Sequence, residues 1–178
     1  MARYSWKTLD SGAIEVTGLP DNPQAHLPQL IQLKAARPIL RWLDAVREAC
    51  APHNLPLFWV LGMIYTESGG NPLAKAPDGG LGLLQITHPS LRVGLTDEQV
   101  LEPERNLAIG CRLIAQHARF TQDLPTLASL FNAGAAKPGV AHPSTSSPWG
   151  MRETTGHIER VVRASNTFCG LIEAGVCK

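Results

Sequence analysis

The sequence predicts a mostly α-helical fold built as a single domain. Apolar residues recur at spacings of three and four along several segments, which is the period of helices with one buried face. Pro, Gly and Asn gather between these segments, where they end one helix and allow the next to begin. The chain has 178 residues, of which 44% are apolar and 17% charged. It is therefore long enough to bury a core and too apolar to be disordered.

Composition and charge exclude several classes of function. The net charge of +1 gives no bulk attraction to nucleic acid or to an anionic membrane. No stretch is long enough and apolar enough to span a bilayer, and the first residues lack the apolar core of a secretory signal. We therefore expect a protein without nucleic-acid partners or a membrane-spanning segment. It would stay inside the cell or leave by a route that the sequence does not reveal.

The four cysteines do not suggest a metal site, because no pair has C-x₂-C spacing. We expect neither a metal nor another cofactor. Cys50 and Cys111 fall on apolar helix faces, which predicts thiols within the core. Cys169 and Cys177 lie close together near the end of the chain, where both a disulfide and two free thiols are compatible with the spacing.

The chain divides into an N-terminal arm, residues 1–36, and a domain that covers residues 37–178. The arm alternates apolar and polar residues over 13–17, which predicts a short strand between glycine-containing turns. A short helix is expected within 27–36. From Pro38 to Cys50 the helical period is clear and predicts the first helix of the domain.

An apolar run from Leu57 to Tyr65 predicts a helix buried on most sides, because apolar residues appear all round it. Glu67 is the first ionisable group after this run. Gly69, Gly70 and a nearby proline end the helix directly afterwards. Burial and the negative end of the helix dipole both disfavour a charged carboxylate, so we expect a raised pKa for Glu67. A carboxyl group that stays protonated near neutral pH can protonate a glycosidic oxygen.

The later helices have recognisable ends. Thr96 and Gln99 stand in the positions of a capping box. A longer helix is expected over 103–120, and Asn106 in its first turn could bond the backbone as readily as a ligand. Another helix opens at Leu124-Pro125 and ends near Asn132. A loop is expected over 135–150, and a final helix begins at about Glu153 and extends towards Ile172.

With these segments placed, the chain resembles the catalytic domain of soluble lytic transglycosylases, which are related to goose-type lysozyme. Five blocks in the family's order support the resemblance, which covers about residues 38–165. They are Glu67-Ser68, Gly82-Leu83-Leu84-Gln85, Asn106 with Gly110, Phe131-Asn132-Ala133-Gly134 and Glu153-Thr154. The resemblance implies a lysozyme-like fold and an enzyme that degrades peptidoglycan.

The resemblance also implies roles for individual residues. Glu67 would be the single catalytic acid and base, and Ser68 would help to position it or the substrate. Gln85 and Asn132 would bond sugar groups near the cleaved bond, and Gln85 offers an amide suited to sugar hydroxyls. The backbone of Gly82 and Leu83 would line the substrate cleft. The substrate would be the glycan strand, cut between N-acetylmuramic acid and N-acetylglucosamine.

Two residues depart from the family's pattern. Phe131 replaces a tyrosine and lacks its hydroxyl, and His157 replaces the tyrosine that lies close to the catalytic glutamate in the family. A histidine there can bond Glu67, but it can also become charged and lower the Glu67 pKa. We therefore expect activity with a pH dependence that differs from that of a tyrosine-bearing relative.

One good carboxylate favours cleavage without water, because the same group can act first as acid and then as base. The product would be a 1,6-anhydromuramic acid end. Two alternatives stay open. Asp78, in the loop between the motifs, could serve a hydrolytic muramidase as the second carboxylate. The chain could also be a non-catalytic peptidoglycan-binding protein.

The expected site of action is the bacterial cell wall, on the periplasmic side, for a monomeric protein. The missing secretory signal fits a phage lysis protein that is made in the cytoplasm and released by a holin. It also fits a virion-associated lysin or a bacterial enzyme exported by a secretion machine. We favour the phage setting.

Overall fold

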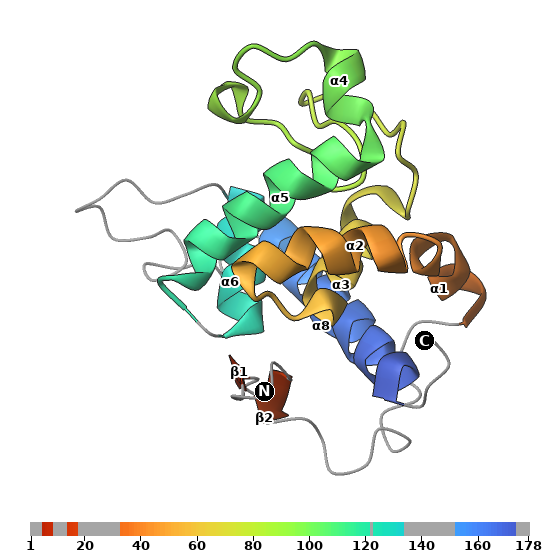
Figure 1. The fold of residues 1–178 in the computed structure, drawn as a ribbon, viewed down its shortest axis with the longest axis vertical. Coiled ribbons are helices and arrows are strands. Elements are labelled where there is room, and N and C mark those ends of the chain that lie inside the picture. Colours follow the sequence, from red (N-terminus) through yellow and green to blue (C-terminus); the bar gives the residue numbers. More distant parts are fainter. Residues whose placement is uncertain (1–4, 9–13, 18–32, 122, 134–151, 174–178) are drawn as a thin grey trace.

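The computed structural model of the protein describes residues 5–8, 14–17, 33–121, 123–133 and 152–173. These residues are mainly helical, as predicted, and Figure 1 shows the helices crossing one another around a shared core. The strands are β1 (Ser5–Thr8) and β2 (Ile14–Thr17). The α-helices are α1 (Leu33–Leu40), α2 (Leu43–Cys50), α3 (Leu57–Ser68), α4 (Asp97–Leu101), α5 (Pro103–Ala118), α6 (Leu124–Ala133) and α8 (Arg152–Glu173). Two short 3₁₀ helices cover Ala51–His53 and Pro89–Leu91.

Helix α3 is the centre of the fold, as its apolar sequence predicts. It packs against α1, α2 and, most extensively, α8. Six consecutive residues, Trp59 to Ile64, are buried, so the helix is covered on all sides along this stretch. Because so little of α3 reaches solvent, the residues at its C-terminal end are held by the whole core.

The crossing of α3 and α8 depends on a glycine. A Cβ at Gly62 would overlap Ser165 Oγ and would lie 2.9 Å from the Ser165 backbone nitrogen and 3.0 Å from the Val161 carbonyl oxygen. The two helix backbones therefore approach closely at this point, which is possible only without a side chain. The crossing fixes α8 against the helix that carries Glu67.

A buried asparagine joins the loop after α3 to α5. Asn106 Oδ1 accepts the Leu84 N–H at 2.8 Å, and its amide nitrogen donates to the carbonyls of Leu81 and Val100 at 2.9 and 3.0 Å. All these bonds are to the protein backbone, so Asn106 has a structural role. Gly110 on α5 gives the loop room, because a Cβ there would overlap the Leu84 side chain.

The N-terminal half of the fold departs from the prediction at two points. The helix expected from Pro38 to Cys50 is wrong, because α1 begins at Leu33, contains Pro38 and ends before α2. The turn at Arg41 and Trp42 separates the two helices, and both side chains donate to the Gly70 carbonyl, at 2.7 and 2.9 Å. The strand predicted over 13–17 is confirmed as β2, which pairs antiparallel with the unpredicted β1.

Several predictions concern residues that the structure leaves undescribed. The loop over 135–150, Gly134 and Cys177 lie outside the described residues. The division at residues 36 and 37 stays a prediction, and α1 crosses it. Within the described residues, no helix has the length and apolar character needed to cross a membrane.

Candidate active site

Glu67 lies at the last turn of α3, as the sequence predicts. The helix ends at Ser68, and Gly69 continues the chain in the left-handed conformation with φ 60°. Gly70 follows with φ 82°, and a Cβ there would lie 2.6 Å from the Pro38 carbonyl oxygen. Both positions therefore require glycine. The turn after Glu67 is thus held tightly against the α1–α2 corner.

The environment of Glu67 favours its protonated form. Burial, with a smaller contribution from the negative charge of Asp78, raises the pKa of Glu67 from an ordinary value of 4.5 to about 7. The positive charge of Arg160 opposes these effects. The side chain stays 17% exposed. Glu67 can therefore exchange its proton near neutral pH and still reach a ligand.

His157 faces Glu67 from α8. Its Nε2 atom lies 3.6 Å from Glu67 Oε1, which is longer than a hydrogen bond. Burial lowers the pKa of His157 to about 4, with a further contribution from the Arg160 cation. The imidazole is therefore neutral when Glu67 exchanges its proton, and the contact is not an ion pair. The predicted effect of a charged His157 on Glu67 moves to acidic pH.

The Nε2 atom of His157 is buried and has no hydrogen-bond partner among the described residues. A buried polar atom without a partner is costly. A shift of roughly half an ångström would bring it within bonding distance of the Glu67 carboxyl group. The neutral ring can donate to a carboxylate or, as the other tautomer, accept from a carboxylic acid. It thus suits both protonation states of Glu67.

Ser68 and Gln85 use their polar groups to shape the backbone near Glu67. The Ser68 hydroxyl donates to the Ile64 carbonyl and accepts from the Gly70 N–H, both at 3.2 Å. The Gln85 amide donates to the carbonyls of Gly82, at 2.8 Å, and Ala74, at 3.3 Å. The sequence did not reveal that Gln85 has a positive φ of 45°. The two side chains fix the turns on either side of the loop.

The other predicted site residues differ in exposure. Gly82 and Leu83 are buried, and a Cβ at Gly82 would overlap the Asn106 amide. Their side-chain positions thus face the interior. Phe131 is half-buried and packs on the core, whereas Asn132 at the end of α6 is exposed.

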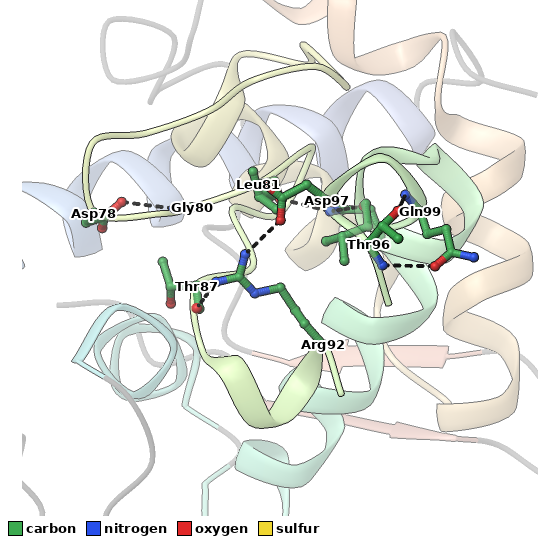
Figure 2. Close-up of polar contacts among 10 residues, drawn as sticks. Asp78, Gly80, Leu81, Thr87, Arg92, Thr96, Asp97 and Gln99 are labelled. Atoms are coloured by element: carbon green, nitrogen blue, oxygen red, sulfur yellow. Dashed lines mark hydrogen bonds and ion pairs between the residues drawn. The ribbon is translucent and has the colours of Figure 1, made fainter. Parts of the chain in front are cut away.

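Asp78 occupies the tip of a small hairpin-like loop. Residues 75 and 81 form an isolated β-bridge, and Ala76 donates to the Gly80 carbonyl at 2.9 Å. Asp78 Oδ1 accepts from the Gly80 N–H at 3.1 Å (Figure 2). The carboxylate is exposed, and its charge acts on Glu67. Asp78 thus acts on Glu67 electrostatically, and its role as the second carboxylate of a hydrolytic muramidase stays the alternative that the sequence offered.

Arg92 closes the following loop. Its guanidinium donates to the Thr87 carbonyl at 2.7 Å and lies 3.7 Å from Asp97 Oδ1. Figure 2 shows this side chain reaching between the two segments, beside the Thr96–Gln99 capping box. The capping box is confirmed by bonds in both directions, at 2.9 and 3.3 Å. Arg92 thus links the segment after Gln85 to the start of α4.

The sequence prediction missed Arg160, whose charge acts on both Glu67 and His157. Its helical spacing of three from His157 was the available signal, since such residues share a face. Within the part of the chain that the structure describes, no group of three or more His, Cys, Asp or Glu side chains could hold a metal ion.

Comparisons with known proteins bear on the family and the fold of the chain. The Transglycosylase SLT domain family model matches residues 44–146, more than half of the chain. A curated relative, the transglycosylase of Enterobacteria phage PRD1, is 27% identical over 131 residues. That match covers 74% of this chain and 45% of the relative. The chain thus spans less than half the length of this relative.

Solved structures share the fold. The 70-kDa soluble lytic transglycosylase from Escherichia coli superposes with a TM-score of 0.63 at 20% identity, over 74% of this chain and 24% of that one. The complex of the 70-kDa soluble lytic transglycosylase with bulgecin A superposes with a TM-score of 0.65 at 20% identity, over 76% of this chain and 25% of that one. An inactive mutant of lytic transglycosylase Slt from Pseudomonas aeruginosa superposes with a TM-score of 0.57 at 16% identity, over 68% of this chain and 23% of that one.

These matches confirm the predicted lysozyme-like helical fold. The family match ends before α8, so the block that contains His157 lies beyond it. The helix that carries Glu67 and the loop after it fall inside the matched range. The chain belongs to the transglycosylase SLT domain family.

Proposed function

We propose that the protein is a lytic transglycosylase that cleaves the glycan strand of bacterial peptidoglycan between N-acetylmuramic acid and N-acetylglucosamine. One observation carries the proposal, namely a buried Glu67 whose pKa of about 7 lets it both give and take a proton. Membership of the transglycosylase family supplies the substrate class. The chemistry and the residue roles are the proposed part.

The proposed reaction uses Glu67 twice. The carboxylic acid gives its proton to the glycosidic oxygen while the bond from that oxygen to muramic acid C1 breaks. The acetamido carbonyl of the muramic acid stabilises the positive charge on C1. The Glu67 carboxylate then takes the proton of the 6-hydroxyl, whose oxygen bonds to C1 and closes a 1,6-anhydro ring. No water is consumed, and Glu67 returns to its acid form.

His157 would act in this reaction as a neutral partner of Glu67. Its Nε2 atom lies 3.6 Å from the Glu67 carboxyl group, so a shift of roughly half an ångström would let it donate to the carboxylate once proton transfer makes Glu67 anionic. A neutral donor stabilises the carboxylate less than a cation would, so the group remains basic enough for the second step. For this reason, the histidine that stands at position 157 in place of the family's tyrosine is compatible with the mechanism.

The remaining predicted site residues would contact or shape the sugar-binding region. Ser68 and Gln85 shape the backbone turns through the bonds described above. Asn132 is exposed and could bond sugar groups, and Phe131 beside it is half-buried. The backbone of the segment that contains Gly82 and Leu83 would line the site. These contacts are proposals that ligand-bound measurements can test.

Mass spectrometry of fragments from purified peptidoglycan tests the reaction. We expect products lighter than the hydrolytic ones by one water, and no products from the Glu67→Gln variant. Hydrolytic products would contradict the non-hydrolytic mechanism. A variant that cleaves as well as the wild type would remove Glu67 from the chemistry. Retained binding without cleavage by either protein would favour the non-catalytic alternative.

A hydrolytic muramidase remains the second candidate, because the Asp78 charge acts on Glu67. The Asp78→Asn variant separates the two. In the transglycosylase, removing this negative charge lowers the Glu67 pKa, so the basic limb of the kcat/KM profile moves to lower pH and activity at the optimum persists. In a hydrolase that needs Asp78, activity falls by about 100-fold or more at every pH.

Asp97→Asn is the matched control for Asp78→Asn. Asp97 is also an exposed carboxylate on this side of the fold, but it lies 3.7 Å from Arg92. The control should keep both the profile and the products of the wild type. If both variants shift the profile equally, the effect is a general one of surface charge and not one of Asp78.

The proposed setting is the bacterial cell wall. Similarity to a phage transglycosylase supports a phage lysin, released through a holin or carried in the virion, over a bacterial enzyme exported by a secretion machine. The partners would be glycan strands, and the monomeric state stays a prediction. The curated relative is longer than the matched region, so the proposal concerns only the transglycosylase activity of that region.

A further inference from the structure

Arg160 is a cation beside the proposed catalytic pair that none of the steps above uses. It lies one helical turn after His157 on α8, so its side chain starts from the same face as the imidazole. Its Nη1 atom is 3.4 Å from the position of a Cβ at Gly156. The guanidinium therefore folds back along α8 over a residue without a side chain, towards the turn that carries His157.

The surroundings of Arg160 leave its donors available. The side chain is exposed, and none of the described carboxylates forms an ion pair with it. Three other arginines near the site or on neighbouring helices are paired, namely Arg47 with Asp44, Arg92 with Asp97 and Arg105 with Glu102. Arg160 nevertheless lies close enough for its charge to act on Glu67.

This placement works against the first proposed step, because the Arg160 cation lowers the Glu67 pKa that burial and Asp78 raise. An unpaired cation near Glu67 favours the carboxylate, whereas the first step needs the acid. An anionic group bound to the guanidinium would cancel that effect. Carboxylate is the anion that a planar guanidinium binds best, through two parallel hydrogen bonds.

From this geometry we infer that Arg160 is a substrate-binding residue that holds a carboxylate of the muramic acid unit next to the cleaved bond. The inference rests on the proposed function. Muramic acid bears a lactyl group, and its carboxylate is free in strands without peptides. In strands with peptides the lactyl carbonyl is an amide, and the nearest carboxylates belong to the peptide. Both sources present the same chemistry to the guanidinium.

Steady-state kinetics on three substrates test this inference. The first is glycan that carries its peptides, the second is amidase-treated glycan with free lactyl carboxylates, and the third is the second after conversion of these carboxylates to neutral methyl esters. Arg160→Gln should raise KM about fivefold on one or both of the anionic substrates and change kcat little. It should leave the KM for the neutral ester unchanged, since the wild type already shows the higher KM on that substrate.

Two further variants control the experiment. Arg160→Lys keeps the charge without the planar fork and should recover part of the affinity. Arg163→Gln removes an exposed arginine one turn further along α8 and should leave KM unchanged. The substrate on which Arg160→Gln acts identifies the source of the carboxylate. Raising the salt concentration should shrink the difference between wild type and Arg160→Gln.

Other outcomes overturn the inference. An equal loss on the neutral ester would mean that Arg160 acts without a carboxylate, and unchanged KM on every substrate would mean that it does not bind the strand. In both cases the wild type still releases anhydro products. If the wild type releases none, the proposed function itself fails, so the two failures are distinguishable.

Discussion

At the scale of a single residue, the burial of Glu67 has consequences for both its chemistry and the stability of the fold. The burial that lets it hold a proton near neutral pH also makes its ionised form costly to the fold. His157 has the complementary property, because its buried ring resists protonation until the pH approaches 4. Between these values one residue exchanges its proton and the other stays neutral, which is the condition that the proposed mechanism needs.

Replacing Glu67 by Gln should therefore stabilise the protein at alkaline pH. The folded protein holds the proton between pH 4.5 and about 7, whereas the unfolded chain releases it near 4.5. Stability from this proton is present below pH 4.5 and is lost as the pH rises through about 7, by about 3 kcal/mol. Urea denaturation at pH 4.5 and pH 8 measures the difference between wild type and variant.

The variant should gain stability relative to the wild type only at pH 8. Glu104→Gln, which removes an exposed carboxylate on α5, should show no such change between the two pH values. An equal difference at both pH values for Glu67→Gln would mean that the carboxyl group is not stabilised in its protonated form.

Replacing His157 by Tyr tests the effect of the imidazole on the pH profile. The folded pKa of about 4 lies below the ordinary 6.5, so the histidine reduces stability as the pH falls from 6.5 through 4. A charged ring also favours the Glu67 carboxylate. We expect wild-type kcat/KM to decline below about pH 5, and the His157→Tyr profile to stay higher there with the same alkaline limb. Superimposable profiles would contradict this role.

At the scale of elements, the active site depends on how α3 crosses α8. Glu67 and His157 belong to different helices, and the distance between their side chains is set where Gly62 meets Ser165. The crossing has no spare volume. A substitution at Gly62 or Ser165 should therefore alter the distance between Glu67 and His157 without changing either of those two residues.

Gly62→Ala should reduce activity more than its loss of stability explains. The added methyl group overlaps Ser165 and must separate the helices, at a cost of roughly 1–3 kcal/mol. A Cβ at Gly170, on the partner helix α8, would meet no atom within 4 Å, so Gly170→Ala should be neutral or stabilising. The measurements are thermal unfolding and kcat/KM at 10 °C, with circular dichroism to establish that each variant is folded there. Full activity of folded Gly62→Ala would mean that the crossing does not position the pair.

Most helices could be predicted because their ends carry local signals. The Gly69 end of α3, the Thr96 capping box and Pro103 at the start of α5 depend on neighbouring residues alone. The corner between α1 and α2 could not be predicted. It forms where Arg41 and Trp42 bond the Gly70 carbonyl, nearly 30 positions away in sequence. Tertiary contacts overrode the helical period that runs from Pro38 to Cys50 in the sequence.

The site was predictable only in part, for the same reason. Glu67 stands out because an apolar run ends there. The proximity of Asp78 depends on the fold of a loop, and the proximity of Arg160 depends on how α8 packs. The positive φ of Gln85 is also invisible in the sequence, since non-glycine residues seldom adopt it. Such features arise from packing and have no local pattern.

At the scale of the whole molecule, α2 and α5 meet at two buried thiols. Cys50 and Cys111 are confirmed as core residues, with exposures of 2% and 0%. The neighbouring Cys111 thiol, together with burial, raises the pKa of the free Cys50 thiol well above its ordinary range. The sequence placed each in the core but did not pair them. Cys169 is a third buried free thiol, and Cys177, for which the sequence left both a disulfide with Cys169 and a free thiol open, lies outside the described residues.

The two thiols should report global unfolding. Alkylation by iodoacetamide needs an exposed thiolate, so we expect neither Cys50 nor Cys111 to react while the core is intact. Labelling at increasing urea, followed by peptide mass spectrometry, should rise with the unfolded fraction measured by circular dichroism. Rapid labelling of Cys50 or Cys111 without denaturant would mean that the α2–α5 contact opens locally.

The close approach at Gly62 also limits how this sequence can vary. Two helix backbones in contact leave one small volume to be shared by two positions, so a substitution at one must be matched at the other. Relatives that keep the acid at the end of α3 should therefore have small residues at both Gly62 and Ser165, or a larger one opposite glycine. The pair should covary as a unit, although neither residue takes part in the chemistry. The helix crossing that holds the proposed catalytic pair would thus constrain two residues that do not contact the substrate.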